Sequence, residues 1–152
     1  MYFWKTHKLA EDIKNETLSD NEWKNYYLAV SILVTFSMYM AYLTTRTNKL
    51  VLLVEAIAIV GVIIFGVSIT YNTNQSGTGN GMNYIARLTA LSLPLLIKFF
   101  VLSIVFGIVL AVFSEVLTLP LSIQESFIVV LAVLVEVLIF WRLNIHLQHI
   151  NT

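Results

Sequence analysis

Four long apolar stretches constrain this 152-residue chain more than any other feature of its sequence. They occupy about residues 24–44, 50–71, 88–114 and 123–142. A membrane-crossing helix needs about 20 apolar residues to span a hydrocarbon layer of ~30 Å. Because lipid offers the backbone no hydrogen-bond partners, each stretch is predicted to be an α-helix. We therefore expect an all-α integral membrane protein, a four-transmembrane-helix antiparallel bundle.

The composition agrees with lipid as the solvent of the chain. Hydrophobic residues make up 58 % of it and charged residues 12 %, against about 45–50 % and 25 % in soluble domains. The formal net charge is zero, so nothing predicts binding to nucleic acid. Cysteine is absent, which excludes disulfides and thiolate metal sites. We recognise no nucleophile–base set, phosphate-binding glycine loop or zinc-protease motif, so neither an enzyme nor a cofactor is expected.

The N-terminal segment differs from the rest of the chain. Residues 1–18 are predicted to form an amphipathic helix lying along the membrane surface, next to a transmembrane domain at 19–152. Tyr2, Phe3 and Trp4 are aromatic side chains of the kind that sit at headgroup level.

The boundaries of two helices are marked by local signals. Ser19 and Glu22 have the spacing of a capping box, so the first membrane helix should begin near Asp20, outside the bilayer. Pro120 lies in a short apolar connection that predicts a tight hairpin between the last two spans. Beyond the last span an apolar pattern continues, which is compatible with a longer helix or with a short strand.

The distribution of basic residues predicts the orientation in the membrane. With four spans, the two termini and the Gly/Asn-rich loop before the third span share one side. That side holds six basic residues and the other side two, which are Lys5, Lys8, Lys14, Lys24, Arg87 and Arg142 against Arg46 and Lys49. The positive-inside rule then favours cytoplasmic termini, in a bacterial inner (plasma) membrane. Arg87, Arg142, Arg46 and Lys49 are our candidates for contacts with headgroups or a docked partner.

Three charged residues lie inside the spans, where each costs about 2.5–3.5 kcal/mol to insert. Measured from Pro120 at 1.5 Å per residue, Lys98 lies roughly 28–30 Å along its helix and Glu136 roughly 20–24 Å. Because a lysine stem can bridge much of that difference, the two are predicted to form a buried ion pair. Glu55 should pair with Arg46 or Lys49 near the interface, or point into a shared cavity.

The first span carries a hydroxyl-rich stripe at helical spacing, formed by Tyr27, Ser31, Thr35 and Tyr42. Because hydroxyl groups are costly against lipid, such a face is not expected to meet lipid along its whole length. It is expected to pack against the other helices or a second subunit, and in an oligomer to line a wet path.

His146 and His149 have the i,i+3 spacing of residues that share one helix face. Two histidines without a neighbouring carboxylate or Cys are a weak metal motif, so no metal site is predicted.

Four spans in 152 residues leave little protein outside the bilayer, so function should reside in the bundle, in its assembly or in a partner. We expect a homo-oligomeric channel-like or scaffold subunit of a membrane complex that docks a cytosolic protein, in a setting such as bacterial stress or phage defence. One alternative is a bacteriocin-immunity-like membrane protein acting as a monomer. Another is a small proton-coupled transporter that uses Glu55 or Glu136.

Overall fold

The computed structural model describes residues 2–43, 48–76 and 83–151, with the backbone alone at 38–43. Five helices account for nearly all of them: α1 Thr6–Lys14, α2 Asp20–Leu43, α3 Lys49–Gln75, α4 Tyr84–Val116 and α5 Leu121–Asn151. The described residues contain no strand, so the predicted all-α class is confirmed. Of the two possibilities for the C-terminal tail, the helix is the one that forms, since α5 continues to Asn151.

Three of these helices, α3, α4 and α5, are long and apolar enough to cross a membrane. At 1.5 Å per residue they measure about 40, 50 and 46 Å, so each exceeds a hydrocarbon layer of ~30 Å. Their large apolar side chains mostly point outward, as in Phe65, Phe106 and Leu134, each more than half exposed. Counted over the described residues, α2 is not one of the three.

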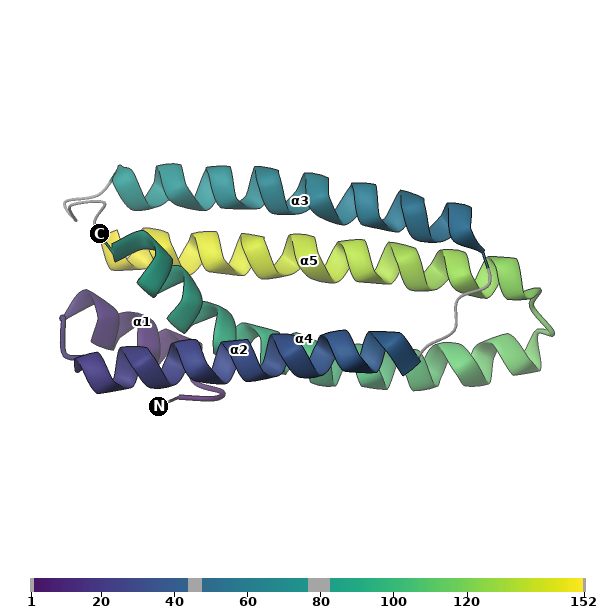
Figure 1. Cartoon of the computed structure of the whole chain (residues 1–152), viewed down its shortest axis with the longest axis horizontal. Coiled ribbons are helices and arrows are strands. Elements are labelled where there is room, and N and C mark those ends of the chain that lie inside the picture. The colour runs from purple at the N-terminus through teal and green to yellow at the C-terminus, as the bar shows by residue number, and fades with distance from the viewer. Residues whose placement is uncertain (1, 44–47, 77–82, 152) are drawn as a thin grey trace.

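The long helices form an open row rather than a closed ring. α3 packs against α5, α5 against α4, and α4 against α2. Figure 1 shows the result, with α3 along one edge of the molecule and α2 along the other. Among the described helices, α2 and α3 are not a closely packed pair. The antiparallel hairpin predicted between the last two spans is present as α4 and α5.

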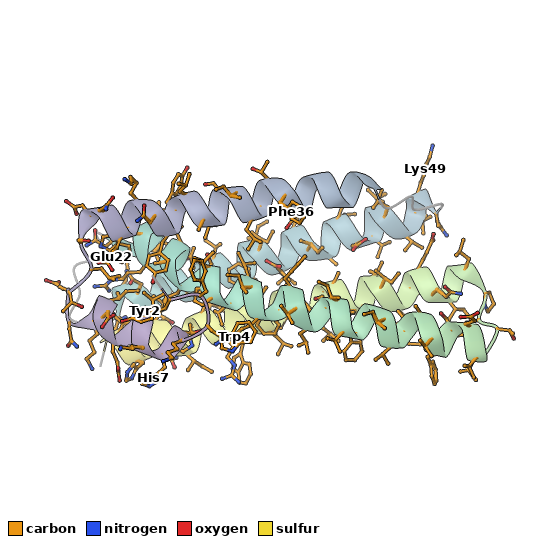
Figure 2. All side chains as sticks on the ribbon, turned by 90° about the horizontal axis from the view of Figure 1, so that it is seen from below. Tyr2, Trp4, His7, Glu22, Phe36 and Lys49 are labelled. Carbon is orange, nitrogen blue, oxygen red and sulfur yellow. The ribbon has the colours of Figure 1, made fainter. Side chains whose placement is uncertain are left out.

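The row has two ends of different character. We call terminal end the one that holds both chain termini, α1, the start of α2 and the residues from Gly66 to Gln75 (Figure 1). The hairpin end holds the start of α3 and the turn between α4 and α5. Figure 2 shows this separation, with Tyr2, His7 and Glu22 at one end and Lys49 at the other.

All of the buried apolar core lies at the terminal end. Its members come from every helix except α3, and they are Leu9, Ala10, Ile13, Tyr26, Tyr84, Ala90, Leu91, Leu93, Leu95, Ile139, Leu143, Leu147 and Ile150. α1 contributes because it packs on α4 and α5. The apolar face of α1, predicted to lie in the membrane surface, is therefore turned into the protein, while Phe3 and Trp4 just before it remain exposed.

Local signals explain where the helices begin and turn. The backbone N–H and the hydroxyl of Ser19 both donate to Glu22 Oε2 at 3.0 Å. These bonds, the backbone one foremost, lower the pKa of the Glu22 carboxyl. The Ser19 side chain donates here, whereas a full capping box would have it accept from the Glu22 N–H. At the hairpin end, Asn48 accepts from the N–H groups of Leu50 and Val51 to cap α3.

Candidate functional site

A groove lies between α2 and α3, with α4 and α5 beneath it, because the two outer helices of the row do not close over the inner ones. Its volume is about 610 Å³. The lining is mostly aliphatic and aromatic, and its polar members are Ser37, Ser103 and Glu136. Each comes from a different helix, so the row itself assembles this group. Glu136 is the ionisable side chain among the residues that line this groove.

Glu136 is half-buried on this groove. No hydrogen bond or ion pair between described residues includes its carboxyl. Ser37 donates to the backbone oxygen of Leu33 at 2.9 Å, so its proton is already used within α2. A carboxyl in this position is able to hold a proton or to receive a cationic group that enters from the open side of the groove.

Lys98 does not form the predicted ion pair with Glu136. Its Nζ donates instead to Thr6 Oγ1 at 2.8 Å. The reason is α1, which packs on α4 and α5 and brings a buried hydroxyl to the lysine. The two residues also lie at different levels along the helix axes, since Glu136 is about one to two turns nearer the α4–α5 turn than Lys98 is.

Glu55 is buried, although it lies in the second turn of α3, close to the hairpin end. Its carboxyl has an interaction within the protein. Arg46, one of its predicted partners, lies outside the described residues. Lys49, the other, is exposed and forms no ion pair with described residues. Both predicted roles of Glu55, a pair near the interface and a place in a shared cavity, stay predictions.

The basic residues singled out at the terminal end have local partners. Arg87 is half-buried and donates to Asn74 Oδ1 at 3.2 Å, which ties α4 to α3. Arg142 is exposed, with its guanidinium 5.1 Å from the centre of the Trp141 ring. That arrangement leaves Arg142 accessible, whereas Arg87 is already engaged in a contact between helices.

The hydroxyl-rich stripe of α2 faces outward as far as the structure describes it. Tyr27 and Thr35 are exposed and Ser31 is half-buried. Ser31 and Thr35 donate to the backbone oxygens one turn earlier, at 2.9 and 2.8 Å. The side chain of Tyr42 lies outside the described residues. The stripe therefore does not pack against the other helices of the same chain at these positions.

A polar network at the terminal end was not predicted. Thr70 and Tyr84 share a hydrogen bond of 2.8 Å, while Thr73 donates to Asn144 Oδ1 at 2.6 Å and its carbonyl accepts from Asn151 at 2.6 Å. The bonds connect α3 to α4 and α5. A signal was present in the sequence, since residues 66, 70, 73 and 74 follow one face of α3 and all are small or polar.

Close helix contact accompanies this network. A Cβ added at Gly66 would lie 2.3 Å from Phe140 Cγ, so the phenyl ring of α5 rests directly on the α3 backbone. Gly66 lies eleven residues after Glu55, so the two share a face of α3, and both are buried.

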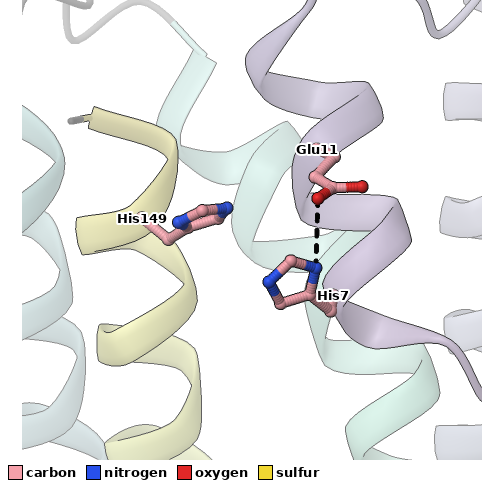
Figure 3. A group of neighbouring side chains, drawn as sticks. All are labelled: His7, Glu11 and His149. Carbon is pink, nitrogen blue, oxygen red and sulfur yellow. Dashed lines mark ion pairs between the residues drawn. The ribbon is translucent and has the colours of Figure 1, made fainter.

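Three side chains at the terminal end have the composition of a metal site: His7 and Glu11 of α1, and His149 of α5 (Figure 3). His7 Nδ1 lies 3.3 Å from Glu11 Oε1, and the His7 and His149 rings have centroids 5.0 Å apart. In the sequence, His146 and His149 have no carboxylate beside them, so no metal site was predicted there. The carboxylate comes from α1, more than 130 residues earlier.

Comparison with known proteins does not add a family to these observations. No family model matches the chain, and no match was found among curated proteins or among solved structures. The function is therefore argued from the geometry alone.

Proposed function

We propose that this chain is a subunit of a membrane-embedded homo-oligomer, in which it acts as a channel-like or scaffold component. In this proposal α2 is a fourth span and the terminal end faces the cytoplasm of a bacterium. The observation that carries the proposal is the open row. Among the described long helices α2 packs closely only against α4, and a groove containing Glu136 remains uncovered.

The length and surface of α2 favour a fourth span. Its 24 residues would extend about 36 Å. Leu28, Ile32 and Phe36 on its surface are all more than half exposed, as side chains in contact with lipid would be. The hydroxyl stripe through Ser31 and Thr35 occupies the same helix, and its internal hydrogen bonds lower the cost of contact with an apolar neighbour.

An assembly would remove the least favourable feature of the single chain, which is the carboxyl of Glu136 on an uncovered groove. An ionised side chain facing lipid costs about 2.5–3.5 kcal/mol on insertion scales. A neighbouring copy that covers the groove would replace lipid around Glu136 with protein or with a water-filled path. Closed symmetric homo-oligomers are common among multi-subunit proteins. In such a ring each subunit would cover the groove of its neighbour, so no groove would be left open.

The side proposed as cytoplasmic also favours docking of a soluble partner. Lys5, Lys8, Lys14 and Lys24 lie there and all four are exposed, as is Arg142. A role in stress or phage defence belongs to the same proposal.

The mass of the particle in lipid nanodiscs tests the proposal. The full chain would be extracted with mild detergent, reconstituted with bacterial lipids and measured by native mass spectrometry, and co-purifying proteins would be identified. We expect one discrete multiple of the 17.2 kDa chain. A monomer at every protein-to-lipid ratio would contradict the proposal and would favour immunity-type recognition of a toxin inside the membrane.

Glu136 gives one specific reason to keep proton-coupled transport as a second candidate. Its carboxyl lies in the groove without a partner among the described residues. Glu136→Gln removes the titratable group and preserves the size of the side chain. Loss of flux with an unchanged oligomer would favour transport, whereas loss of the oligomer would favour a role of this carboxyl in assembly. Glu115→Gln, at an exposed position near the turn, is the matched control.

A further inference from the structure

We propose that His7, Glu11 and His149 bind one divalent transition-metal ion, of which Zn²⁺ fits best, and that the ion fastens α1 to the end of α5. The inference does not depend on the proposed function, because it rests on a different part of the molecule. Figure 3 shows the three side chains converging from the two helices.

The distances are those of ligands around a small ion. With zinc–nitrogen and zinc–oxygen bonds of about 2.0–2.1 Å, tetrahedral ligand atoms lie about 3.3–3.4 Å apart. His7 Nδ1 and Glu11 Oε1 are 3.3 Å apart, and the ligand atoms of all three residues lie within 4.8 Å of one another.

The two helices hold the three residues in place. His7 and Glu11 are one turn apart on α1, and the neighbouring face of that helix is anchored in the core by Leu9, Ala10 and Ile13, each no more than 2 % exposed. On α5, His149 lies between the buried residues Leu147 and Ile150. The backbones are therefore fixed before an ion arrives, which lowers the entropy lost on binding.

The outer side of the cluster is open to solvent. The His7 and Glu11 side chains are 69 % and 51 % exposed, so an ion can reach them without unfolding α1. Three protein ligands also leave a fourth tetrahedral position for water.

The ligand types select the class of ion. Two imidazoles and one carboxylate suit zinc and neighbouring transition metals, whereas Mg²⁺ and Ca²⁺ prefer sets made of oxygen atoms. Positive charge nearby opposes binding of a cation, since the charges of Lys98 and Arg142 repel a positive charge at His146 in the same region. Glu11 offsets part of it by bringing a negative charge into the ligand set.

Metal titration of the full chain tests the site. The protein, with any affinity tag removed and metal stripped by EDTA, would be titrated in nanodiscs with Co²⁺, whose absorption bands report tetrahedral coordination, and then with Zn²⁺ in competition. We expect one ion per chain. His7→Ala and His149→Ala should each weaken binding by more than the ~10–100-fold that follows loss of an outer-shell partner. Glu11→Gln should also weaken it.

His146→Ala is the matched control, because His146 lies on α5 three residues from His149 and is absent from the cluster. It should leave Co²⁺ binding unchanged. Hydrogen exchange gives an independent readout: Zn²⁺ should slow exchange of the α1 amides in the unaltered chain and not in His149→Ala. The proposal is overturned by the absence of stoichiometric binding, by binding that persists in both histidine variants, or by its loss in His146→Ala.

Discussion

The terminal end and the hairpin end are built from the same helices but follow opposite packing rules. At the terminal end, thirteen apolar residues are buried together in one core. At the hairpin end, the described residues that reach the buried class are Glu55, Ser114 and Glu125, none of them apolar, while aliphatic and aromatic side chains point outward. Along the same helices, apolar side chains are therefore buried at the terminal end and exposed at the hairpin end.

Solvent accounts for this difference. In water, apolar side chains gain about 25 cal/mol per Å² when they are buried, so a core forms wherever helices emerge from the bilayer. In lipid that gain disappears, and helices associate through small residues and polar contacts instead. α4 and α5 exceed a 30 Å layer by about 16–20 Å, and α1 packs on both helices. The terminal end thus has the packing expected of helices in water, and the hairpin end the packing expected of helices in lipid.

The largest expected effect compares one leucine from each end. Leu147 is fully buried at the terminal end, whereas Leu134, on the same helix, is 53 % exposed. Leu147→Ala should lower the free energy of unfolding by about 2–5 kcal/mol, because it leaves a cavity in the core. Leu134→Ala should change it by no more than about 0.5 kcal/mol. Denaturation by SDS in mixed micelles, followed by circular dichroism, measures both. Equal losses would break the comparison.

An intermediate effect is expected at Gly66, where the two ends meet. Gly66→Ala should destabilise the contact between α3 and α5 by about 1–3 kcal/mol, because the new methyl group overlaps the Phe140 ring. Gly61→Ala is the control, since nothing lies within 4 Å of a Cβ there. It should be neutral or slightly stabilising through the higher helix propensity of alanine. Disulfide trapping between cysteines introduced on α3 and α5 would report the separation, and an unaltered trapping rate in Gly66→Ala would contradict the prediction.

The smallest effect concerns pH and the start of α2. Since the Ser19 N–H and hydroxyl lower the pKa of the Glu22 carboxyl in the folded protein, the folded state binds its proton less readily than the unfolded chain does. The stabilisation is present above the unfolded pKa of Glu22 and is lost as pH falls through the lower folded value. Glu22→Gln should flatten that part of the profile of Tm against pH. Asp20→Asn, which changes an exposed carboxylate in the same turn, serves as the control. An identical profile in Glu22→Gln would show that the cap contributes nothing.

The sequence by itself determined the helices and the solvent around them. The predicted spans at 50–71, 88–114 and 123–142 lie within α3, α4 and α5, and the Ser19–Glu22 signal located the first residue of α2. These features depend on neighbours within a turn or on a run of apolar side chains, so they can be read along the chain.

The tertiary structure decided which helices touch and which side chains meet. The three helices that are long and apolar enough to cross a membrane are apolar around most of their circumference. Lipid accommodates every such face equally well, so the sequence pattern does not indicate a partner helix. The open row, the bond from Lys98 to Thr6 and the convergence of His7 with His149 all join segments far apart in the sequence. The second and third follow from the docking of α1, whose apolar face was predicted to enter the membrane surface and instead completes a core.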